Sequence, residues 1–142
     1  MRTVHEDHVT KSLVAVVESG EDAVSALTQL AHDDGIGAAS FIGIGVFAEA
    51  VIGYLNPHTN SYDEFTIDEP AEVTAFSGTI SLNHGQPEIH AHAALGMADT
   101  TVRGGHLIRA AVHPTLEVSI DVYDSPLHCR FDEATGQELI AP

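Results

Sequence analysis

Apolar and polar residues follow a helical period near the start of this chain and a strand period through most of the rest. Residues 12–18 are rich in valine and predict a strand. Ser19–Asp22 supplies a helix cap and an acidic first turn, and apolar side chains then recur at helical spacing. The pattern predicts one amphipathic helix over about residues 21–34, which Gly35 ends.

From residue 38 onward, short apolar runs separated by turn clusters are typical of β-structure. The predicted strands are residues 38–44, 46–55, 62–67, 72–82, 88–95, 107–112, 116–123 and 127–131. We expect Gly43–Gly45 to link the first two strands tightly, His113–Thr115 to separate the sixth from the seventh, and Gly78 to mark a bulge. The pattern predicts an α+β fold with a mainly antiparallel or mixed sheet packed by one main helix.

The length of 142 residues suits one compact domain. We expect residues 1–10 to form a flexible arm and residues 11–142 to form the single domain. No apolar run approaches the roughly 18 residues of a membrane span, and the polar, acidic start does not resemble a signal peptide. We therefore expect a cytoplasmic protein with no membrane partner.

Charge narrows the set of partners. The chain has 21 Asp and Glu against five Lys and Arg, so its formal net charge is -16. Nucleic-acid binders usually present a basic patch, and the few cations here are scattered along the sequence. Direct DNA binding is therefore disfavoured. The single Cys129 excludes an intrachain disulfide and a cysteine-rich zinc site, and we expect it to be a small buried apolar residue.

The strongest candidate chemistry lies in Glu88-Ile89-His90-Ala91-His92. Successive side chains of a strand point to opposite faces, so Glu88, His90 and His92 share one face and the apolar residues between them share the other. His106 follows two glycines, which allow a close approach of the backbone. Three imidazoles with an open fourth position are typical of catalytic zinc sites.

The residues alone leave two interpretations open for this segment. One is a metal site of His90, His92 and His106, with Glu88 as a fourth ligand, an orienting group or a general acid or base. The other is a polar strand face whose histidines are solvated. Gly43–Gly45 lacks the remaining residues of a phosphate loop, and Ser77-Gly78 lacks the G-x-S-x-G pattern of a serine hydrolase.

Several segments, taken in order, resemble the PPC (plants and prokaryotes conserved) domain family. The resemblance covers about residues 11–131, and its most specific part is H-x-H followed by G-G-H. The matching segments are Gly43-Ile44-Gly45, Gly53-Tyr54, Glu72, Ser77-Gly78-Thr79-Ile80, Pro87-Glu88-Ile89-His90-Ala91-His92, Gly104-Gly105-His106-Leu107 and Glu117-Val118.

The resemblance implies an α+β fold, a homotrimer, and a divalent metal, often zinc, held by His90, His92 and His106. Plant relatives contact DNA through an R-G-R-P-type AT-hook, which this sequence lacks. A DNA-binding label would therefore rest on a missing segment, whereas the assembly and protein contacts made by the domain could transfer.

Two functions are consistent with these expectations. The favoured one is a stand-alone, homotrimeric metal-binding module that acts through protein partners. The alternative is a small metalloenzyme with a three-His zinc site, in which Glu88 would move a proton.

Overall fold

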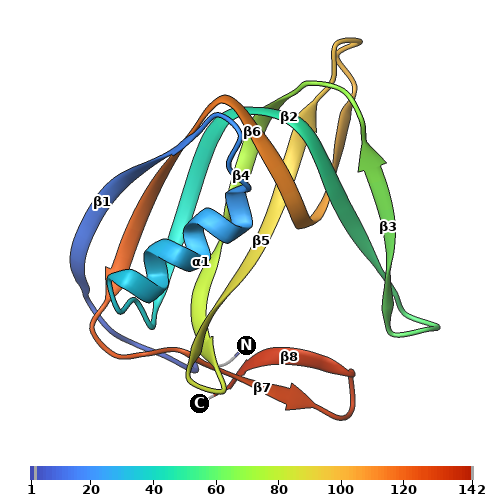
Figure 1. Ribbon diagram of the computed structural model, residues 1–142. Helices are drawn as coiled ribbons and strands as arrows, with labels where there is room; N and C mark the ends of the chain where they lie inside the picture. The colour runs from blue at the N-terminus through green and yellow to red at the C-terminus, as the bar shows by residue number, and fades with distance from the viewer. Residues whose placement is uncertain (2, 142) are drawn as a thin grey trace.

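The computed structural model describes Met1 and residues 3–141. Arg2, which the sequence places in the arm, and Pro142, at the end of the predicted domain, lie outside the described residues. The described part is mostly β-sheet with one short helix (Figure 1). Its elements are β1 (Val9–Glu18), α1 (Ala23–Asp33), β2 (Ala39–Asn56), β3 (Ser61–Ile67), β4 (Ala71–Asn83), β5 (Gln86–Gly96), β6 (Val102–Tyr123), β7 (His128–Asp132) and β8 (Gln137–Ala141).

Four long strands close on themselves around the core. The sheet runs in the order β3-β2-β6-β5-β4-β7-β8, with β1 paired to β6 and an additional pairing of β2 with β4. Because β2 pairs with both β4 and β6, and β5 joins β4 to β6, these four strands form a ring. The pairings are antiparallel except for β4 with β7, which is parallel and consists of Leu82 opposite His128.

The core fills the inside of this ring. Phe41 and Phe47 both pack on Phe76, with ring centroids 5.1 and 6.5 Å away. The helix α1 lies against β5 and β6 and buries Leu27 and Ala31 (Figure 1). The buried apolar side chains therefore point inward, and the alternate side chains of the ring strands face outward.

The start of α1 is also tied to the sheet. Asp22 is its N-cap and accepts hydrogen bonds from the backbone N–H of Ser25 and of Ala110, each at 2.8 Å. Gly35, with a φ of +65°, follows the helix as predicted. One carboxylate therefore caps the helix and holds it on β6.

The predicted elements are largely confirmed, but two predicted breaks are wrong. β2 continues through Gly43–Gly45, where a bulge shifts its register. A β-carbon on Gly45 would collide with the carbonyl oxygen of Thr115, so this glycine allows close strand packing and does not turn the chain. β6 likewise continues through His113–Thr115, because an irregularity in its pairing with β2 absorbs the extra residues.

Three further details differ from the expectations. Gly78 is in regular register, and the irregularity of β4 lies between Val73 and Ala75. β8, which the sequence pattern did not predict, follows the last predicted strand and pairs with β7. The fold is mostly β, so the α+β label applies only loosely. β1 begins at Val9, and the arm boundary at residue 10 stays a prediction.

Candidate metal centre

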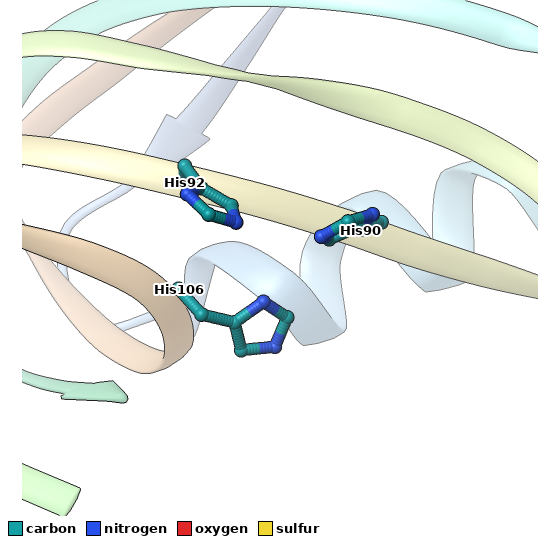
Figure 2. Close-up of side chains that lie close together, drawn as sticks. All are labelled: His90, His92 and His106. Carbon is teal, nitrogen blue, oxygen red and sulfur yellow. The ribbon is translucent and has the colours of Figure 1, made fainter. Parts of the chain in front are cut away.

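Two neighbouring strands place three histidines together. His90 and His92 project outward from β5, while Ala91 and Ala93 between and beside them are buried. His106 lies on β6 directly opposite His92. The three rings face a common space (Figure 2), with centroids 5.3 to 5.6 Å apart. The predicted strand alternation is confirmed, and the sheet register brings the third imidazole to the first two.

Close backbone approach determines where His106 lies. A β-carbon on Gly105 would be 2.7 Å from the carbonyl oxygen of Gly53, a distance that real β-carbons do not tolerate. On the other strand, a β-carbon on Gly53 would be 2.7 Å from Cδ1 of Tyr62. The Tyr62 ring therefore lies across Gly53 and stacks on His106, with centroids 4.7 Å apart and planes 23° apart. Glycine at these two positions lets both neighbours pack around the imidazole.

The environment keeps two of the imidazoles in the form that binds metals. Burial, followed by the neighbouring His90, lowers the pKa of His92 below its ordinary value. Burial also lowers the pKa of His106, with smaller contributions from His90 and His92. A neutral imidazole has a free lone pair, which a metal ion requires. Both shifts therefore favour metal binding near neutral pH.

The three side chains fit a divalent ion. Each offers one ring nitrogen, and these nitrogens all lie within 4.8 Å of one another. Nδ1 of His106 is buried and finds no hydrogen-bond partner in the described part of the chain, which is costly for a polar atom unless something binds it. A donor set of three imidazoles is typical of zinc. Glu88 lies on the same face outside this group, and its role as ligand, orienting group or acid stays a prediction.

The three histidines open into a large cleft of about 1070 Å³. On one side it is lined by Tyr54 and Tyr62 of the β2–β3 hairpin, and on the other by residues of the β7–β8 hairpin, including Phe131 and Leu139. A cleft of this size beside convergent polar groups is typical of small-molecule sites. The candidate metal centre is therefore accessible from outside the chain.

Sequence reasoning missed two parts of this site. The stack of Tyr62 on His106 depends on the register of β3 against β2, which residue types do not reveal. The prediction that Cys129 is a small buried apolar residue holds only in part, because this residue is half-buried and lines the cleft. Its sulfur lies 3.1 Å from the hydroxyl oxygen of Ser81 in a hydrogen-bonded pair. The thiol therefore has a polar partner, the Ser81 hydroxyl, in addition to apolar neighbours.

The family model described as the Plants and Prokaryotes Conserved (PCC) domain matches residues 4–124. None of the curated proteins matches the chain. Solved structures that match include a metal-containing protein from Archaeoglobus fulgidus, with 32% identity, a TM-score of 0.93, and coverage of 99% of this chain and 100% of that one.

A plant- and prokaryote-conserved protein from Pyrococcus horikoshii has 23% identity and a TM-score of 0.93, with 99% of this chain and 98% of that chain covered, and shows the fold alone. A candidate DNA-binding protein from Ralstonia eutropha has 29% identity and a TM-score of 0.86, with 91% and 90% covered.

Proposed function

Because this chain belongs to the Plants and Prokaryotes Conserved domain family, we propose that it forms a homotrimeric module that binds one divalent ion per subunit through His90, His92 and His106. The observation that carries the proposal is the convergence of three ring nitrogens within 4.8 Å. The Archaeoglobus relative, which is metal-containing, supports it. Zinc is the expected metal because the donors are three neutral imidazoles.

An exposed apolar strip supports self-association. We define this apolar strip as Val14, Val16, Ile42 and Ile44, each more than half exposed on the outer face of the sheet. Val14 and Ile42 both pair with Ser119, and Val16 and Ile44 both pair with Glu117, so the four side chains lie close together. An exposed apolar patch of this kind typically marks an interface. A symmetric homo-oligomer would cover it.

The apolar strip and the histidines share one face of the sheet. The cross-strand row that joins Val14, Ser119 and Ile42 continues through Ser77 to His92. Paired residues of neighbouring strands point to the same side. The histidines therefore lie beside the proposed subunit boundary, and an ion bound there would add to the stability of the assembly through linkage.

The charge of the chain does not support direct DNA binding. A formal net charge of -16 repels the phosphate backbone, and each additional subunit adds to the repulsion. The description of the Ralstonia relative as a candidate DNA-binding protein applies to that protein. For this chain we propose protein partners, in a cytoplasmic setting.

A small metalloenzyme is the second candidate function. The cleft of about 1070 Å³ that reaches the histidines favours it, because a reaction requires access to the ion. Three-His sites with an open fourth position are typical of catalytic zinc. Glu88, which lines the cleft and shares the strand face of His90 and His92, is the residue proposed to move a proton.

The experiment that tests the module is light scattering combined with thermal melting, with and without chelator. The wild type is expected to be a trimer whose melting temperature falls on metal removal. Ile44→Asp places a charge within the apolar strip and is expected to give monomers. Val102→Asp is the matched control, because Val102 is equally exposed but lies outside the strip. A chelator that changes neither the assembly nor the melting temperature would exclude a structural role for the metal.

A further inference from the structure

The β7–β8 hairpin lies outside the residues 4–124 that the family model matches. At its base it joins β4 through the Leu82–His128 pair and through the hydrogen bond between Ser81 and Cys129. Its tip lies against the turn between β2 and β3. A β-carbon on Gly136 would be 3.2 Å from the side-chain amide nitrogen of Asn60. The hairpin, drawn in red in Figure 1, thus reaches from β4 to the β2–β3 turn.

This span turns an open sheet face into a cleft. Without the hairpin, the histidines would lie on an outward face of β5 and β6. With it, Phe131 and Leu139 form a second wall that faces the same space as Tyr54 and Tyr62. All four side chains are more than a third exposed, so apolar and aromatic surface is available for contact with a ligand.

The charge of the lining restricts the ligand. Among the described residues that line the cleft there is no Lys or Arg, while Glu88 and Glu138 contribute carboxylates. Oε2 of Glu138 is buried on the hairpin side and has no hydrogen-bond partner among the described residues. A buried carboxylate oxygen without a donor favours a ligand that brings an N–H or a positive charge, and disfavours an anion at this end.

We propose that the β7–β8 hairpin makes the histidine face a binding site for a small molecule with a flat apolar body and one nitrogen donor. The donor nitrogen reaches the ion at the histidines, and the body lies between the hairpin and the two tyrosines. The end of the body next to Glu138 is neutral or cationic. The donor contact rests on the proposed metal function, whereas the contact with the body depends only on the walls of the cleft.

Three probes test this site by calorimetry on the full chain, both loaded with Zn²⁺ and metal-free. They are imidazole, 4-phenylimidazole and 4-(imidazol-4-yl)benzoate. In the loaded protein 4-phenylimidazole is expected to bind about tenfold more tightly than imidazole, because its ring buries apolar surface. The benzoate is expected to lose most of that gain, because its carboxylate faces Glu138. In the metal-free protein both neutral probes bind more weakly but keep their order.

Phe131→Ala is the test variant and Val102→Ala its matched control. Both side chains are 62% exposed, so neither substitution threatens folding, and only Phe131 lines the cleft. Phe131→Ala is expected to lower the advantage of 4-phenylimidazole over imidazole about fivefold, and Val102→Ala to leave it unchanged.

Equal affinity for the two neutral probes would overturn the inference, and so would an advantage of 4-phenylimidazole that survives Phe131→Ala. Both results are also expected if a second copy of the chain fills the cleft. Tight binding of the benzoate would overturn its charge restriction. Failure of the proposed function looks different, because the protein would then bind no Zn²⁺ while the metal-free arm still ranked the probes.

Discussion

Gly105→Ala is expected to displace His106 and to weaken both the fold and the metal centre. The new β-carbon would lie 2.7 Å from the carbonyl oxygen of Gly53, whereas ordinary contacts begin at 3.4 Å. The strands must therefore separate by about 0.7 Å next to His106. The obstacle is backbone within a paired strand, so no side chain can turn away to relieve the contact.

The size of the effect follows from this displacement. Overpacking of this kind costs about 1–3 kcal/mol, which corresponds to a fall in melting temperature of roughly 3–10 °C for a chain of this length. A shift larger than about 0.5 Å exceeds the tolerance of a binding constellation, so Zn²⁺ affinity is expected to fall about 10–100-fold.

Melting of metal-free protein and Zn²⁺ calorimetry measure the two effects of Gly105→Ala separately. Gly96→Ala is the control, because its β-carbon would press on the side chain of Thr74, an exposed residue, at 3.1 Å and would meet the backbone oxygen of Glu72 at an ordinary distance of 3.7 Å. If Gly105→Ala melts within about 1 °C of the wild type and binds Zn²⁺ equally well, close backbone approach does not position His106.

Three other outcomes follow from individual groups. In metal-free protein, the lowered pKa of His92 and His106 means that the unfolded chain binds more protons than the folded chain. Urea midpoints should therefore fall as the pH drops below about 6.5, and should level off once the histidines of the folded protein are also protonated. Backbone N–H donors of Ser125 and His8 lower the pKa of Asp7, so its contribution to the stability of the fold is present above pH ~4 and lost in stronger acid. Asp7→Asn should therefore reduce the loss of stability in acid, as followed by circular dichroism. Leu27→Ala should lower the free energy of unfolding by about 2–5 kcal/mol in urea titrations, because Leu27 is fully buried on the inner face of α1.

Local pattern was sufficient for most elements of the fold. Alternation along β5 places His90 and His92 on one face, and the cap at Asp22 with Gly35 beyond it defines α1. The pattern failed at a glycine, because the same residue type can either turn the chain or allow two strands to pack closely. At Gly45 the missing side chain allows β6 to approach, which in sequence looks the same as a turn.

The site required information that only the tertiary structure supplies. Local spacing does not indicate that His106 pairs with His92, which is a matter of register between strands. The wall formed by the β7–β8 hairpin could not be predicted either, because the hairpin joins β4 through one residue pair and one side-chain hydrogen bond, and its tip contacts a turn remote in sequence. The three candidate ligands could be named from the sequence and the family resemblance, but the cleft around them could not be predicted.

Metal analysis of the purified protein after exposure to Zn²⁺ and removal of free metal tests the central claim most directly. The wild type is expected to retain one zinc ion per chain, and His90→Ala substantially less, because His90 supplies one of the three ring nitrogens. His58→Ala, which removes an exposed histidine from the β2–β3 turn outside the cluster, should retain as much zinc as the wild type. A wild type without stoichiometric zinc, or His90→Ala with a full complement, would contradict the account.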